Sequence, residues 1–161
     1  MNRVFVNAQE IPLPVWSASI CEYAVKVLNE IKRDNWELSV LLCGDKTITE
    51  LNARYRDKPE ATDILSFRLG ETIEDGDASV YLPGDIVISL DTLRENAQYF
   101  QIPQDEELRR LLIHGILHLD GMDHGTNDKT EPMLILQEEI LNSLKGEHIF
   151  AGAEEKNETS L

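Results

Sequence analysis

Cysteines, aromatic residues and long apolar runs are scarce in this chain of 161 residues. Two cysteines, Cys21 and Cys43, are too few for a disulfide framework, and their apolar neighbours predict small buried side chains. No apolar stretch reaches the roughly 18 residues of a membrane-spanning helix. No apolar segment of a signal peptide follows Arg3. These absences predict a protein of the reducing cytoplasm without a membrane partner.

Basic residues are also few, because 15 Lys and Arg stand against 30 Asp and Glu, for a net charge of −15. This balance argues against a general nucleic-acid coat, since phosphate binding depends on Lys and Arg. The acidity is uneven: residues 51–68 hold four bases and three acids, whereas residues 69–107 hold one base and ten acids. A local basic patch can outweigh the net charge within a Debye length of about 8 Å.

The composition, 42% hydrophobic and 28% charged, is that of a globular protein. We expect one domain over residues 1–146 and an acidic, flexible tail over 147–161. Apolar periodicity predicts strands at 3–7, 36–43, 63–69 and 85–90, and helices at 15–33, 46–57, 92–101, 105–119 and 131–146. The polar segment 70–83 is predicted to be a mobile loop. The expected fold class is α+β, a small mixed sheet of about four strands packed with about five helices.

Three of the four histidines fall within one short segment, HGILHLDGMDH. His114 and His118 lie four residues apart on one face of the helix 105–119, which is apolar all round and should therefore be central. Gly121 lets the chain leave the helix and turn back, which brings His124 over the same face. Three imidazoles leave a fourth position open on a tetrahedral ion, as in catalytic zinc sites. We therefore expect one Zn²⁺ here, although copper, nickel or iron could bind the same ligands in vitro.

The histidine spacing also matches the frame of the metzincin peptidases. Those enzymes need a glutamate directly after the first histidine as general base. This chain has Gly115 at that position, which cannot accept a proton. Peptide hydrolysis by that mechanism is therefore not expected. We expect Gly115 instead to leave room beside the metal for a bulky substrate.

The histidine segment resembles the signature of the YbeY-type rRNA maturation endoribonucleases. Further segments resemble motifs of that family in the same order: LNARYRDKPEATDILSF, GDIVIS and QEEIL. Together the matches cover about residues 47–145. The chain departs from the family at Ala61, where a proline usually precedes Thr-Asp, and at Arg68, where a proline usually follows Ser-Phe. These departures concern the local loop path and not the metal site, and Arg68 could add a phosphate contact.

The resemblance implies a zinc-dependent, single-strand-preferring endoribonuclease of small-subunit rRNA maturation and ribosome quality control. It implies His114, His118 and His124 as metal ligands. It also implies Arg56 as a catalytic or RNA-binding residue, so Arg56 and His114 are the expected catalytic residues of a metal-dependent hydrolase domain. Precursor rRNA is the expected partner, together with proteins of the small ribosomal subunit. The oligomeric state is left open.

Physical chemistry gives Arg56 a reason to act on RNA. Phosphodiester cleavage needs stabilisation of negative charge on the transferring phosphoryl group, and a guanidinium can bind two phosphate oxygens at once. Arg54 lies two residues earlier on the predicted helix and should point elsewhere. Lys58 and Arg68 could line an RNA groove or be ordinary surface charges.

No residue stands out as the general base. Asp123 adjoins His124 and fits a turn residue better than a base. Asp63 and Asp85 each begin a strand, and either could orient a ligand histidine by accepting its second N–H group. The nucleophile could be an activated water or the ribose 2′-OH. His148 falls in the expected tail, and we expect it to have no role.

The sequence is also compatible with other functions. One is a non-catalytic ribosome assembly factor in which the metal holds a loop, although an open coordination position disfavours a structural metal. Another is a metallohydrolase of a different substrate, including peptides, which Gly115 disfavours. A binding module without metal is the last, and elemental analysis would expose it.

Overall fold

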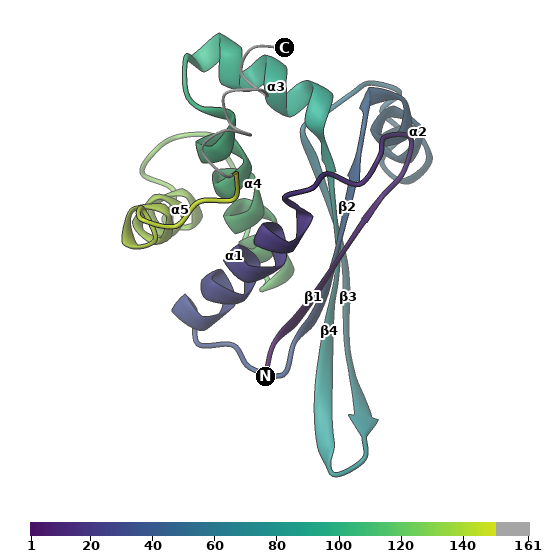
Figure 1. Ribbon diagram of the computed structural model, residues 1–161, viewed down its shortest axis with the longest axis vertical. Helices are drawn as coiled ribbons and strands as arrows, with labels where there is room; N and C mark the ends of the chain where they lie inside the picture. The colour runs from purple at the N-terminus through teal and green to yellow at the C-terminus, as the bar shows by residue number, and fades with distance from the viewer. Residues whose placement is uncertain (151–161) are drawn as a thin grey trace.

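A four-stranded mixed sheet forms the centre of the computed structural model, which describes residues 1–150. The strands are β1 (Arg3–Ala8), β2 (Glu37–Cys43), β3 (Ile64–Asp75) and β4 (Ala78–Ser89), in the order β1-β2-β4-β3. β1, β2 and β4 are parallel, and β3 pairs antiparallel with β4 at the edge of the sheet (Figure 1).

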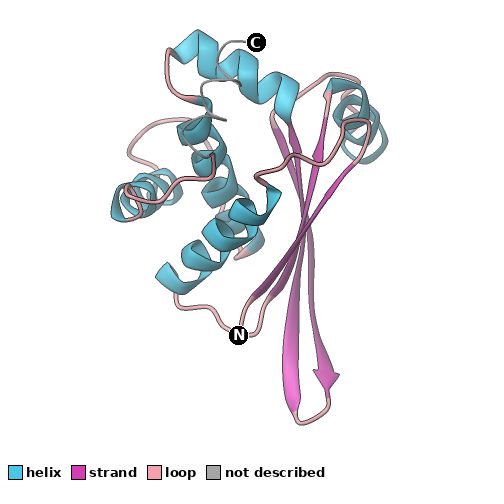
Figure 2. Cartoon of the chain, viewed as in Figure 1, coloured by secondary structure: helices cyan, strands magenta, loops and turns pink. Residues whose placement is uncertain are grey.

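Five helices surround this sheet: α1 (Ser17–Glu30), α2 (Asp45–Arg56), α3 (Leu90–Phe100), α4 (Gln104–Leu119) and α5 (Pro132–Ser143). α1 and α4 cover one face, with α5 packed against α4, whereas α2 lies on the opposite face at one end of the sheet (Figure 2). With four strands and five helices in residues 1–150, the predicted α+β class is confirmed.

The helix α4 lies at the centre of the core, as its apolar surface predicts. Leu108, Leu112 and Ile116 are completely buried and belong to the same core cluster as Ile86 and Ile88 of β4. Burial on every side fixes the helix between the sheet and α5, so that side chains near its end are held rigidly. Within the described residues, no helix combines the length and apolarity needed to cross a membrane.

The segment 70–83 is not the mobile loop that its composition predicts. β3 and β4 extend for 12 residues each and remain paired as far as Asp75 and Ala78. The far half of this hairpin projects beyond the rest of the molecule as a two-stranded ribbon (Figure 1). The described side chains from 70 to 79 are mostly exposed. The sequence therefore lacks the alternation of apolar and polar residues that marks a half-buried strand. Without that alternation, the pattern does not indicate that this segment pairs as two strands.

The expected tail does not begin at residue 147. Ile149 and Phe150 are buried, with exposed fractions of 1% and 5%. Their backbone N–H groups donate to one carboxylate oxygen of Asp105, at 2.8 and 2.9 Å. Residues 147–150 are therefore part of the packed fold. The rest of the predicted tail, 151–161, lies outside the described residues.

Replacing Asp105 should destabilise the fold, because this carboxylate is buried and joins two distant parts of the chain. Its second oxygen accepts hydrogen bonds from Arg109 Nε at 2.7 Å and His148 Nδ1 at 3.1 Å. The expected absence of a role for His148 is therefore wrong. We expect Asp105→Ala to lower the free energy of unfolding by about 3–5 kcal/mol, since Arg109 is left buried without its partner. The control Glu95→Ala, at an exposed position of α3, should change it by less than about 0.5 kcal/mol.

The Asp105 carboxylate should also make the free energy of unfolding fall in acid. Burial raises the pKa of Asp105, but the hydrogen bonds from Phe150, Ile149 and His148 and the charge of Arg109 outweigh it and hold the pKa below its ordinary 3.8. The contribution is therefore complete above pH 3.8 and is lost as the pH falls through the folded-state pKa. Urea unfolding from about pH 7 to about pH 2 should show the gap between wild type and Asp105→Ala closing in acid. A gap that stays constant would contradict this assignment.

Candidate metal centre

The three histidines that the sequence singles out meet beside β3. His114 and His118 lie one turn apart near the end of α4, and their Nε2 atoms are 3.1 Å apart. His124 comes from the turn that follows α4, with its ring centroid 5.2 and 5.4 Å from the other two. One nitrogen from each ring lies within 4.8 Å of the others. This group could hold a metal ion, as the spacing predicts.

The second nitrogen of each ring shows which atoms face the centre. His114 Nδ1 lies 2.7 Å from Gln137 Oε1, His118 Nδ1 lies 3.1 Å from the Met122 carbonyl oxygen, and His124 Nδ1 lies 2.9 Å from that of Thr126. These oxygens only accept hydrogen bonds, so each Nδ1 carries the proton and each Nε2 presents a lone pair. Two lone pairs facing each other at 3.1 Å repel, and a cation between them removes the repulsion. The donor set therefore fits a metal ion.

The orientation of Gln137 is itself fixed. Its side-chain Nε2 donates to Glu138 Oε2 at 3.1 Å, so its carbonyl oxygen is the end that faces His114. Glu138 in turn accepts from the Arg110 guanidinium at 3.0 and 3.2 Å. A chain of hydrogen bonds from α5 to α4 therefore sets the tautomer of the first histidine.

The turn after α4 brings His124 back over the helix. The N–H of Gly121 donates to the His118 carbonyl at 3.0 Å, and that of Met122 donates to Leu117 at 3.0 Å. Gly121 has a φ of +98°, which side chains other than glycine rarely adopt. The predicted use of this glycine to leave the helix is thus confirmed, and its positive φ lies in the turn that returns His124 to the other two histidines.

Burial prepares the histidines for metal binding. It is the largest influence on the pKa of His114 and of His118, and both values are lowered from 6.5. Both rings are therefore neutral at pH 7. A neutral imidazole is the form that coordinates metal ions, so no proton has to leave first.

Gly115 does not lie beside the metal centre, in contrast to the expectation that it makes room for substrate. A Cβ at this position would lie 2.9 Å from Ile86 Cδ1 and 3.0 Å from Ile64 Cδ1. The glycine therefore faces the sheet and allows α4 to approach it closely. A glutamate here would be buried in the core, which removes the metzincin mechanism on geometric grounds as well.

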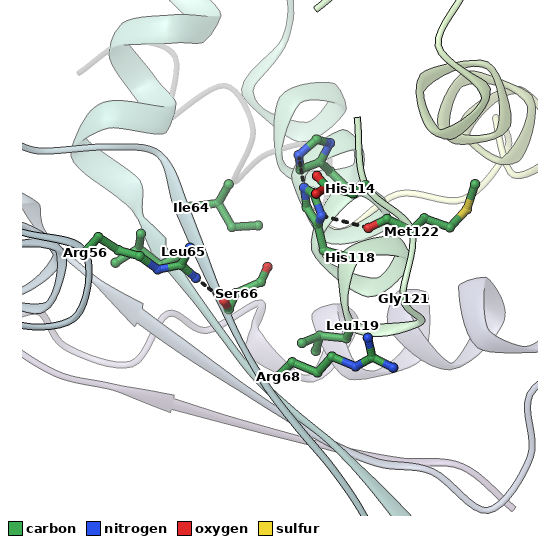
Figure 3. Close-up of a pocket in the computed structure, with 11 residues that line it drawn as sticks. Arg56, Ile64, Leu65, Ser66, Arg68, His114, His118, Leu119, Gly121 and Met122 are labelled. Atoms are coloured by element: carbon green, nitrogen blue, oxygen red, sulfur yellow. Dashed lines mark hydrogen bonds between the residues drawn. The ribbon is translucent and has the colours of Figure 1, made fainter. Parts of the chain in front are cut away.

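A pocket of about 410 Å³ opens in front of the histidines. Its walls come from the end of α2, the start of β3, the end of α4 and the turn after it (Figure 3). The polar side chains lining it include Arg56, Ser66, Arg68, His114, His118 and Asp123. Residues from distant parts of the chain are thus collected around one concave site, the usual form of an active site.

Arg56 reaches this pocket from the last turn of α2. Its Nη2 donates to the Ser66 carbonyl oxygen at 2.7 Å, and its guanidinium lies 5.6 Å from the centre of the Phe67 ring. Arg54 lies against Tyr55 instead and does not line the pocket. Lys58 lines a neighbouring cavity of about 340 Å³, which Arg56 also borders. The guanidinium that the resemblance singles out therefore shares a pocket with the metal centre.

The two aspartates considered for orienting the histidines do not do so. Among the described residues, Asp63 accepts hydrogen bonds from Asn96 and Thr62 rather than from a histidine. Asp85 lines a cavity on the opposite face of the sheet. Asp123 accepts the N–H of His124 at 2.8 Å, as a turn residue does, although its side chain also borders the pocket.

Comparison with known proteins agrees with this arrangement. A family model for endoribonuclease YbeY matches residues 6–145. Endoribonuclease YbeY of Treponema denticola is 45% identical over 126 residues, which are 78% of this chain and 81% of the relative. The chain belongs to the endoribonuclease YbeY family.

Other relatives and a solved structure extend this similarity. Endoribonuclease YbeY of Borreliella burgdorferi (strain ZS7) is 47% identical over 131 residues, 77% of this chain and 84% of the relative. The solution structure of TM1509 from Thermotoga maritima has a TM-score of 0.57 and 26% identity, covering 91% of this chain and 93% of that one. The resemblance to the YbeY family drawn from the sequence motifs is therefore confirmed.

Gln137 is the functional contact that the sequence analysis missed. It lies within QEEIL, a segment noted only for its resemblance to the YbeY family. We expect Gln137→Leu, which keeps the side-chain size but removes the acceptor, to weaken metal binding, measured with Zn²⁺, about 10- to 100-fold. Gln137→Glu should retain most of the affinity, and Glu139→Leu, at an exposed position of the same helix, all of it. Competition with a chelator measures the three values, and equal affinity of Gln137→Leu and wild type would reject this role.

Proposed function

We propose that this chain is a zinc-dependent endoribonuclease that cuts single-stranded regions of precursor small-subunit rRNA in the cytoplasm. Membership of the endoribonuclease YbeY family supports the coarser part, a metal-dependent hydrolase that cleaves RNA. Zinc and rRNA are the more specific parts of the proposal. We assign the activity to one domain, residues 1–146 with the docked segment 147–150.

One observation carries the proposal: His114 and His118 border the same open pocket as the Arg56 guanidinium, and His124 converges on these two histidines to complete a set of three ligands. Three nitrogen ligands leave a coordination position free, which suits catalysis rather than a structural metal. Imidazole ligands suit zinc, as they also suit copper, nickel and iron. A cationic side chain at the same place adds the recognition that a phosphodiester requires.

The histidines and Arg56 have different roles in this proposal. His114, His118 and His124 would hold the ion through their Nε2 atoms, and we count His114 as catalytic in this sense. Zinc bound there supplies a Lewis acid for the phosphoryl group. Arg56 uses one nitrogen on the Ser66 carbonyl oxygen, which fixes the guanidinium while its remaining N–H groups can donate to phosphate oxygens.

The size of the pocket supports the preference for single strands. A volume of about 410 Å³ suits one ligand of the size of a nucleotide. A single strand can bend into such a site, whereas a paired strand would first have to leave its duplex. The acidic charge outside the pocket would repel loosely bound RNA, so a protein of the small subunit could present the substrate.

The test uses zinc-loaded protein, metal-stripped protein and stripped protein to which zinc has been returned. Each is incubated with precursor small-subunit rRNA, a short single-stranded RNA and the same RNA as a duplex. We expect cleavage of the single-stranded substrates by the first and third preparations only. Equal cleavage by all three would indicate a contaminating ribonuclease. RNA binding without cleavage by zinc-loaded protein would favour the assembly factor, and digestion of casein would favour a hydrolase of another substrate.

A further inference from the structure

Arg68 is a second guanidinium that borders the pocket. It lies on β3 two residues after Ser66, and alternation along a strand places Ile64, Ser66 and Arg68 on the same face. All three border the pocket, on the side of the sheet that α4 covers. The register of β3 thus directs the side chain to the wall of the pocket, on the side of Gly121 (Figure 3).

The backbone around Arg68 reinforces this direction. The pairing of β3 and β4 shifts between Arg68 and Glu71, so a β-bulge begins at this residue. Bulges bend a strand and redirect the side chains beside them. Both terminal nitrogens of Arg68 lie 3.5 Å from the place where a Cβ of Gly121 would be, next to the turn that carries His124 (Figure 3). The exposed guanidinium therefore lies beside the glycine of the turn that carries His124.

Arg68 also lacks the partner that most arginines of this acidic chain have. Ion pairs with carboxylates occupy five of the other seven: Arg3, Arg33, Arg94, Arg109 and Arg110. Within residues 1–150, no such pair is formed by Arg68, although Asp123 borders the same pocket and directs one oxygen to the N–H of His124. A cation left unpaired in a chain of charge −15 is available to an anionic ligand.

We propose that Arg68 binds a phosphate of the RNA strand next to the one that Arg56 binds, so that the strand crosses the pocket along the edge of β3. This inference rests on the proposed function. Arg56 is fixed at the Ser66 carbonyl and Arg68 leaves the strand about 7 Å further along, since each residue of a strand advances about 3.3 Å. Two separate phosphates of one strand can therefore be held at once. The contact is a binding contact, and it adds to the affinity for the RNA strand and to its position rather than to the chemical step.

The test compares zinc-loaded wild type, Arg68→Gln and Arg68→Lys on a short single-stranded RNA over a series of salt concentrations. Loss of one charged hydrogen-bonding group should raise KM about 10-fold or more in Arg68→Gln, with kcat changed less than about 3-fold because the reacting group is untouched. The slope of log affinity against log salt should become shallower by about 0.7, the contribution of one phosphate contact to a single strand. Arg68→Lys should keep the wild-type slope, and Arg54→Gln, which removes the same charge outside the pocket, should keep both slope and KM.

Fluorescence anisotropy with the same RNA separates this proposal from the proposed function. If wild type binds but does not cut RNA, the proposed function fails, and the slopes measured by anisotropy still decide on Arg68. An unchanged slope in Arg68→Gln, an equal change in Arg54→Gln or an absence of RNA binding by wild type would each overturn the proposal. Circular dichroism confirms that the variants are folded, and Arg68→Lys provides the comparison should Arg68→Gln unfold.

Discussion

The variant His118→Ala is expected to lose RNA cleavage by at least about 10³-fold. A catalytic metal ion supplies several kcal/mol of charge stabilisation in the transition state, and each 1.4 kcal/mol corresponds to about tenfold in rate. His118 is the middle ligand of the three, with its Nε2 3.1 Å from that of His114. Without it, two imidazoles remain, and they do not form the three-ligand site of catalytic zinc. We therefore expect zinc content and activity to fall together.

His148→Ala is the matched control, because it removes the fourth histidine of the chain without touching the pocket. His148 lies against Asp105 at the opposite end of α4. Its removal should reduce stability modestly and leave zinc content and turnover at wild-type values. Elemental analysis and a cleavage assay on identically purified proteins make the comparison. Full turnover by His118→Ala without zinc would show that the reaction needs no ion at this site.

The parts of the structure that could be predicted are those that depend on residue spacing within a short segment of the chain. The spacing of His114 and His118 within an apolar helix predicts both the buried position of α4 and the shared face of the two rings. Gly121 predicts the turn, because a positive φ is a backbone requirement that glycine meets on its own. These features depend on residues close together in the chain.

The parts that could not be predicted depend on contacts between distant segments. The outer half of the β3–β4 ribbon is a different case, because its pairing is local and runs to Asp75 and Ala78 across a two-residue turn. Its described side chains are exposed, so the polar sequence resembles a loop. Asp105 looks like an ordinary acid at a helix start, and its burial follows from the segment 147–150 that folds over it. Gln137 of α5 contacts His114 of α4, and this contact depends on how the two helices pack. The sequence instead suggested Asp63 and Asp85 as partners of a histidine, because each was expected to begin a strand.

For Arg56, the sequence motif indicates which residue matters, whereas its place in the pocket depends on the fold. Its residue type could be identified from the resemblance to the YbeY family, but its distance from the histidines follows from the packing of α2 beside β3. The hydrogen bond to the Ser66 carbonyl fixes the guanidinium at the edge strand. Its positive charge also acts on His118, where it contributes to the lowered pKa. The two groups therefore belong to one electrostatic site.

The variant Arg56→Ala is expected to lower kcat by about 10²–10³-fold, the effect of removing one fixed donor aimed at developing charge. Arg56→Lys should recover only a part of this loss. A lysine ammonium is a point charge on a flexible stem, and it cannot hold the Ser66 carbonyl and grip two phosphate oxygens in a fixed plane. Stability should change by no more than about 1 kcal/mol, because the Ser66 hydrogen bond is exposed to solvent.

Single-turnover cleavage of the short single-stranded RNA measures this effect on the chemical step, and zinc content shows whether the metal centre is intact. Arg54→Ala is the matched control, since it removes the same charge from the same helix but not from the pocket. An Arg56→Ala protein that retains zinc and cuts at the wild-type rate would leave the histidines as the whole catalytic site. A loss in kcat with zinc retained would mean that the guanidinium acts on the reacting phosphate, because neither the fold nor the metal then accounts for the defect.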